Sequence, residues 1–318
     1  MYKATAATIL VTLTNSAFAT TYDNTSPTIG ANDGVTWTDG SRTVSLTVVG
    51  DLTVTGGTFT PATVAVDRQN FVGEAVLTLG LSSGTLNPGA MTVGQHSRVE
   101  VLGPVSIGTN LSLSYNAKLN VASSLTVGGT LTMSDSSELK LVGGGISAGN
   151  FQQVDGDISG IGQITSGTTG LLNDSFTPAD YGTVGTLGFG KLKFGPNSSY
   201  TVDLVDDGNG NWTSDLIELT GNAGTDADYP TIINVANLDL STLPSDVLYP
   251  ILTAEDALPA IPNTLIFYSV FSFQDGRELV LQLSDGNKTL NVVVVPEPGM
   301  IAVASMLGLG MIRRSRRS

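Results

Sequence analysis

Apolar and polar residues alternate along short segments between Arg42 and Gly170, and glycine-rich stretches separate these segments. The triplets LTV, LTM and LKL show the pattern, in which the first and third residues are apolar. A period of two is that of a β-strand with one buried face. The pattern therefore predicts an all-β body of many short strands, with glycine at the breaks between them.

These strands recur in a unit of 20 residues. The segment VSIGTNLSLSYNAKLNV, which begins at Val105, matches LTVGGTLTMSDSSELKL, which begins at Leu125, along its whole length. A shorter copy begins at Met91, and a third copy begins at Ile146 and then degrades. The two full copies agree at apolar and glycine positions, which pair Val105 with Leu125, Ile107 with Val127, Gly108 with Gly128, Leu111 with Leu131, Leu113 with Met133, Leu119 with Leu139, and Val121 with Leu141.

A single unit of this size cannot bury its own apolar face, whereas stacked units can. We therefore expect residues 20–170 to form a right-handed parallel β-helix, or β-solenoid. The alternative is a β-sandwich or another all-β fold in which the internal similarity is coincidental.

The repeat disappears after Gly170. Within 171–295, the segment LKFGPNSSYTVDLVDDGNGNWTSDLIELTGN predicts a β-hairpin around a polar turn, and YPILTA, LIFYSVFSF, ELVLQLSDG and TLNVVVV predict strands. We expect this C-terminal β region to cap the open end of the solenoid or to form a small sandwich.

Both ends of the chain differ from the body. Residues 1–19 hold Lys3, an apolar stretch from Ala4 to Leu13, and Ala17-Phe18-Ala19, the small-x-small form that a signal peptidase accepts. This order predicts a signal peptide with a short apolar helix. The alternatives are an ordinary first strand or a disordered terminus.

Residues 296–318 begin with the rigid tripeptide Pro296-Glu297-Pro298 and continue with an uncharged apolar run, Gly299 to Ile312, which predicts a second short helix. The run has 14 residues, fewer than the roughly 20 that a membrane-spanning helix needs, so we expect transient insertion into the inner membrane. A plain C-terminal anchor is the alternative. The chain ends in a basic cluster that would stay in the cytoplasm and leave the body outside, consisting of Arg313, Arg314, Arg316 and Arg317.

The order of Val-Pro-Glu-Pro, apolar run and Arg-rich end resembles the PEP-CTERM sorting signal of exported bacterial proteins. The resemblance covers only the end of the chain. It implies processing by a membrane exosortase, with Pro296, Glu297 and Pro298 as the recognition element, and a link to exopolysaccharide and biofilm matrix. The repetitive body also resembles the low-complexity β-helical passengers of autotransporter-like surface proteins.

The charge of the chain limits its partners. The formal net charge is −14, and all 28 acidic residues lie between Ala19 and Arg313. Such a body repels phosphates, so we expect no binding to nucleic acid. The chain has no cysteine, which rules out disulfides, thiolate zinc sites and a cysteine nucleophile.

Few residues suggest site chemistry. His96 is the only histidine; it lacks the motif of a serine hydrolase and is best interpreted as a surface residue. The segment DGNGNWTSDLIE places oxygen-bearing side chains at the ligand positions of a calcium loop, although Trp212 replaces the usual glycine; the positions are Asp207, Asn209, Asn211, Asp215 and Glu218. A long Gly-Asn hairpin turn without a metal would have the same composition.

Taken together, these features predict an exported structural or adhesive protein of the cell surface or extracellular matrix, without catalysis. We expect no cofactor other than this calcium ion. The alternative is a carbohydrate-binding or polysaccharide-cleaving β-helix protein, which would need carboxylates and a base on one outer face. The few arginines of the body, Arg42, Arg68, Arg98 and Arg277, form no evident cluster with aspartates.

Overall fold

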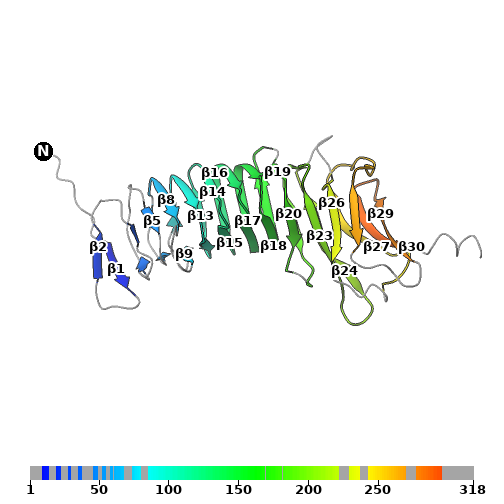
Figure 1. Ribbon diagram of the computed structural model, residues 1–318, viewed down its shortest axis with the longest axis horizontal. Helices are drawn as coiled ribbons and strands as arrows, with labels where there is room; N and C mark the ends of the chain where they lie inside the picture. Colours follow the sequence, from blue (N-terminus) through cyan, green and yellow to red (C-terminus); the bar gives the residue numbers. More distant parts are fainter. Residues whose placement is uncertain are drawn as a thin grey trace, which may run out of the picture.

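Stacked β-strands form the body of this protein, and they follow one another along its long axis (Figure 1). The computed structural model describes residues 61–67, 74–79, 85–168, 170–180, 182–221, 229–236, 243–269 and 277–295, and seven short strands between 9 and 59. Every regular element in these residues is a strand. The predicted all-β class is therefore confirmed.

The chain winds through three parallel sheets, which we call faces A, B and C. Face A contains β4 (Val35–Trp37), β6 (Leu52–Val54), β9 (Ala75–Leu79), β12 (Ser97–Val101), β15 (Lys118–Val121), the starts of β17 (Glu138–Gln153) and β18 (Asp157–Ser166), β20 (Ser175–Pro178), β23 (Ser199–Asp206), β26 (Ile232–Ala236) and β28 (Ile266–Ser269). Face B contains β7 (Thr58–Phe59), β10 (Thr85–Leu86), β13 (Val105–Ile107), the start of β16 (Ser124–Met133), the middle of β17, the end of β18, β21 (Thr186–Phe189), β25 (Leu216–Leu219) and β27 (Leu248–Ala254). Face C contains β3 (Thr28–Ile29), β5 (Leu46–Val48), β8 (Thr63–Val66), β11 (Ala90–Val93), β14 (Leu111–Leu113), the ends of β16 and β17, β19 (Gly170–Leu172) and β22 (Leu192–Phe194).

Each turn of the chain places one strand on each face, and successive turns stack in parallel into a β-solenoid. The register is the one that the 20-residue repeat predicts. Val105 lies opposite Leu125 on face B, Leu111 opposite Leu131 on face C, and Leu119 opposite Leu139 on face A. Each matched pair therefore stacks within one column of the core.

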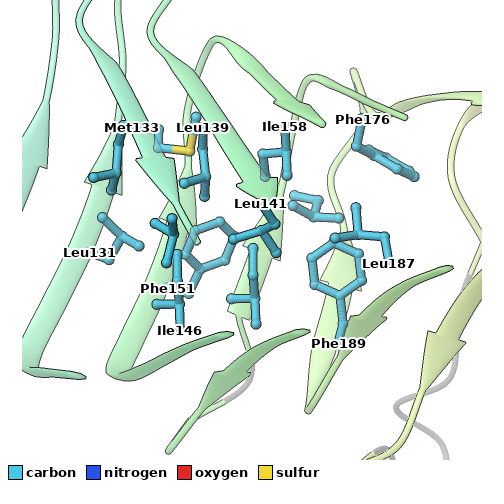
Figure 2. Packing of buried hydrophobic residues seen from close by; sticks show 14 of the residues in the cluster. Leu131, Met133, Leu139, Leu141, Ile146, Phe151, Ile158, Phe176, Leu187 and Phe189 are labelled. Atoms are coloured by element: carbon cyan, nitrogen blue, oxygen red, sulfur yellow. The ribbon is translucent and has the colours of Figure 1, made fainter. Parts of the chain in front are cut away.

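The core lies between the three faces and is filled by the inward residues of every strand. Leu131, Met133, Leu139 and Ile146 are almost completely buried, and Figure 2 shows them converging with Phe151. Burial of one such side chain contributes about 1.5–3 kcal/mol. Because the interior is filled along its length, outward residues are left to carry any surface function.

The parallel stacking continues past Gly170, where the sequence repeat fades. On face A, the spacing between paired residues changes from 18 (Ile158 and Phe176) to 24 (Ser175 and Ser199) and then to 33 (Ser199 and Ile232). Insertions at the corners lengthen these turns, so a fixed period is lost although the strands still stack. Aromatic packing also replaces part of the aliphatic core, with Phe176 stacked on Phe194 and on Tyr200.

The predicted hairpin is present, but its strands belong to the solenoid. The chain turns between β23 and β24 (Trp212–Ser214), which pair antiparallel, while β23 and β25 stack on faces A and B. At the C-terminal end, β27 pairs antiparallel with β30 (Thr289–Val295), and β30 pairs with β29 (Glu278–Ser284). This antiparallel sheet closes the stack (Figure 1).

The other end of the stack begins with β1 (Ile9–Leu13) and β2 (Ala19–Tyr22), which pair antiparallel. The structure describes only Ile9–Leu13 of the predicted N-terminal helix, as the strand β1, and the predicted C-terminal helix, residues 299–312, lies outside the described residues. Both helices stay predictions. Within the part of the chain that the structure describes, we find no helix with the length and apolar character needed to cross a bilayer.

Candidate functional site

The sorting residues lie outside the described residues. This holds for the tripeptide Pro296, Glu297 and Pro298 and for the basic cluster of Arg313, Arg314, Arg316 and Arg317. The cleavage position of the predicted signal peptide is described only as the start of β2, at Ala19. Export and sorting therefore stay predictions from the sequence.

His96 lies at the corner between faces C and A and is exposed. Its backbone has a positive φ of 51°, and the equivalent corner positions one and two turns on, Asn116 and Ser136, have φ values of 58°. The recurrence of this conformation shows that His96 occupies a structural turn position.

The five predicted calcium ligands are not brought around one point. Asp207 lies exposed at the tip of the β23–β24 hairpin, where its carboxylate accepts hydrogen bonds from the backbone N–H groups of Asn209 and Asn211 and from the Asn211 side chain. Asp215 lies at the base of the hairpin, level with Asp203. Four residues separate that level from Asp207, or about 13 Å of strand at about 3.3 Å per residue, which is too far for one calcium ion.

Glu218 lies exposed on β25, beyond the hairpin base. Within the described part of the chain, no three residues among His, Asp and Glu form a group that could hold a metal ion. The hydrogen bond from the Asn211 side chain, followed by those from the backbone, holds the pKa of Asp207 below its ordinary value. The Asp207 carboxylate is thus engaged by the polar groups of its own hairpin tip.

Asp203 and Asp215 form a buried pair of acids, of which the sequence indicated only Asp215, as a calcium ligand. The two residues are 1% and 0% exposed. By strand alternation, Asp203 points away from the core side chains of Val202 and Leu204, yet the corner segment between β20 and β21 covers it. The only signal available in the sequence was that two aspartates bracket the hairpin, Asp203 within the alternating segment of β23 and Asp215 directly before β25.

Backbone N–H groups hold both carboxyl groups in place. Asp215 Oδ1 accepts a hydrogen bond from the Gly185 N–H at 2.8 Å, and its Oδ2 accepts one from the Asp203 N–H at 3.0 Å. Asp203 Oδ2 accepts a hydrogen bond from the Gly182 N–H at 2.9 Å. The buried Asp203 Oδ1 makes no hydrogen bond in the structure.

Burial disfavours the charged form of these acids. It raises the pKa of Asp215 to about 7, and the negative charge of Asp203 adds to the effect. Burial likewise raises the pKa of Asp203. Tyr200, fully buried beside them, has a pKa raised well above its ordinary value by burial and by the charges of both acids.

A small surface cavity of about 190 Å³ is lined in part by residues of the same corner segment, Ala179, Asp180 and Thr183. Its apolar wall includes Val142 and Ile161, which are 54% and 46% exposed. Lys140 and Asp180 line it as well and form an ion pair at 2.6 Å. The cavity offers an apolar surface with one neutralised charge pair and no arrangement of nucleophile and base.

Face A carries the ion pairs of the solenoid. Lys118 contacts Glu138 on the neighbouring strand, whereas Arg98 contacts Glu100 on its own strand and Glu74, the residue before β9. Exposed pairs of this kind contribute about 0–1 kcal/mol each. These pairs favour the native register of the strands on face A and have little effect on the stability of the fold.

No protein-family model matches the chain, and no curated protein has a sequence that matches it significantly. The resemblance of the C-terminal end to a PEP-CTERM signal accordingly rests on the residues themselves.

Proposed function

We propose that this protein is an exported structural or adhesive component of the cell surface or extracellular matrix, without catalytic activity. The observation that carries the proposal is the continuous stack of parallel turns from face to face, with a filled core along its length. Such a body is a stiff spacer whose long outer faces are available for contact. Its fine geometry, including a right-handed coil and an autotransporter-like character, belongs to the same proposal.

Two further observations support a structural role. The most buried carboxylates, Asp203 and Asp215, are engaged by backbone N–H groups rather than directed at solvent. The acidic composition of the body also suits a protein that stays soluble outside the cell.

Export and retention are assigned to the two ends of the chain. A signal peptidase would remove residues 1–19, and an exosortase would recognise Pro296, Glu297 and Pro298 while the apolar run sits in the inner membrane. The basic cluster would stop translocation. Exopolysaccharide is the matrix partner that this sorting route implies.

The test is the intact mass of the full chain recovered from the envelope and medium of its native host. A variant with all three residues 296–298 changed to alanine is compared with Arg317→Lys, which keeps the charge of the cluster. We expect the wild type and Arg317→Lys to lose residues 1–19 and the C-terminal tail, and the triple variant to keep its tail in the membrane fraction. An intact tail on the wild type would refute the sorting proposal.

The absence of catalysis needs a separate measurement. The mature protein is incubated with matrix polysaccharide from the same host, and new reducing ends and co-sedimentation are both measured. We expect co-sedimentation without new reducing ends. Release of sugar ends would instead establish the polysaccharide-cleaving alternative, whatever the fate of the tail.

A further inference from the structure

Two carboxyl groups without solvent contact are unusual in a protein whose other described acids are at least partly exposed. Asp203 belongs to β23 and Asp215 directly precedes β25. Their backbones also bond, because the Asp215 N–H donates to the Asp203 carbonyl at 2.9 Å. The two acids therefore join face A, face B and the corner residues Gly182 and Gly185 at one point.

No cation compensates the pair among the described residues. The ion pairs of Lys140, Lys118 and Arg98 all involve other acids. The groups that face the pair are the hydroxyl of Tyr200, which donates to the Ile251 carbonyl, and the backbone N–H groups of Gly182 and Gly185. Asp180, on the same corner segment, is paired with Lys140.

The hydrogen bonds supply three donors for four carboxyl oxygens. The fourth oxygen, Asp203 Oδ1, is buried without a donor. A buried acceptor of this kind is costly when it is charged, and a proton on either acid removes one of the two adjacent negative charges.

We propose that Asp203 and Asp215 hold one proton between them in the folded protein, on one acid or the other, and that loss of this proton as the pH rises loosens the junction of β23, β25 and the corner segment. The solenoid is then more stable at mildly acidic pH than at neutral pH. The titration belongs to the pair rather than to either residue, because the two acids interact.

Proton linkage gives the direction in which stability changes with pH. A folded-state pKa above the ordinary carboxyl value means that the folded protein binds the proton more tightly than the unfolded chain does. The resulting stabilisation is complete below the ordinary carboxyl pKa, near 4, and is lost as the pH rises towards the folded value of about 7. Stability should be level above that pH.

The test compares the wild type with Asp215→Asn and Asp203→Asn, and uses Asp207→Asn as the matched control on the same hairpin. Unfolding by denaturant is measured between pH 5 and pH 8.5, with amide exchange at Gly182 and Gly185. We expect the wild-type unfolding constant to rise by about 100-fold over this range, because about two pH units lie between pH 5 and the folded pKa of about 7. Asp207→Asn should keep this slope, and Asp215→Asn should flatten it.

A wild-type stability that does not change between pH 5 and pH 8, or a slope that Asp215→Asn leaves intact, would overturn the proposal. If the variants at 203 and 215 do not fold, the carboxyl carbons of the wild type can be titrated by NMR after labelling of aspartate. A carboxyl midpoint between pH 5 and pH 8 supports the retained proton, and midpoints all below pH 5 exclude it.

Discussion

At the corners between faces C and A, the backbone conformation decides which residues fit. His96, Asn116 and Ser136 take positive φ values one turn apart, and in the next turn Gly156, which lies against Ser137, has a φ of 113°. Asparagine tolerates this region well and glycine best. The sequence shows these positions only as polar residues at a fixed spacing, so it indicates a turn there but not its conformation.

Gly156 combines this conformation with close contact. A Cβ at this position would collide with the Ser137 carbonyl oxygen of the preceding turn, whereas a Cβ at Gly208, whose φ is 83°, would meet nothing. We expect Gly208→Ala to lower the free energy of unfolding by about 1 kcal/mol through backbone strain alone. Gly156→Ala should lower it by about 3 kcal/mol or more, since the collision adds to the strain.

Denaturant unfolding of the two variants beside the wild type measures the difference. Equal losses of unfolding free energy in the two variants would contradict the prediction. They would mean that the backbone at Gly156 moves to accept a Cβ at no cost, and that the contact with Ser137 is looser than the structure indicates.

The elements were predictable to different degrees. The strands of the regular turns follow from alternation and from the 20-residue match, down to the pairing of Leu119 with Leu139. The hairpin was also predictable, because a polar Gly-Asn turn lies between two alternating segments. The burial of the Asp215 side chain was not predictable. It depends on the corner segment that supplies the Gly185 N–H, and the sequence does not show that this segment folds over β23.

The separation of Asp207 from Asp215 along the hairpin predicts how the protein responds to calcium. With Asp207 at the hairpin tip and Asp215 engaged at its base, we expect millimolar calcium to leave the melting temperature unchanged, with magnesium as the matched control ion. Asp207→Ala should still loosen the hairpin, because three hydrogen bonds are lost. A rise in melting temperature that calcium alone produces, and that Asp207→Ala abolishes, would restore the calcium site.

Acid should act on the hairpin tip in the opposite sense to the buried pair. The pKa of Asp207 is lowered, so the stabilisation of the tip is present above the ordinary carboxyl pKa and is lost as the pH falls through the folded value. Amide exchange at Asn209 and Asn211 reports the tip, and exchange at Gly185 reports the pair.

At the scale of the whole molecule, a solenoid is held together by contacts between neighbouring turns. The regular part was predictable because each turn repeats the length of the last. The part beyond Gly170 was not, because insertions at the corners change the spacing without breaking the parallel pairing. The sequence repeat therefore marks where the turns are equal in length, and the stack extends further than the repeat.

Because the regular turns are equal in length, one of them can be removed without changing the register of the others. Removal of residues 118–137, one whole unit, would place Val99 opposite Leu139 and Val101 opposite Leu141, because Leu119 and Val121 now stand between those pairs in the same columns. Every remaining strand would keep its face. We expect this variant to keep its β-sheet circular dichroism and a single cooperative melt, at a somewhat lower temperature, because one interface between turns is lost. Removal of residues 118–127, half a unit, takes away fewer residues but shifts the later strands to the wrong faces, so that variant should lose the cooperative melt. If the two deletions were equally disruptive, the stability of the stack would depend on the individual turn rather than on the phase of the repeat.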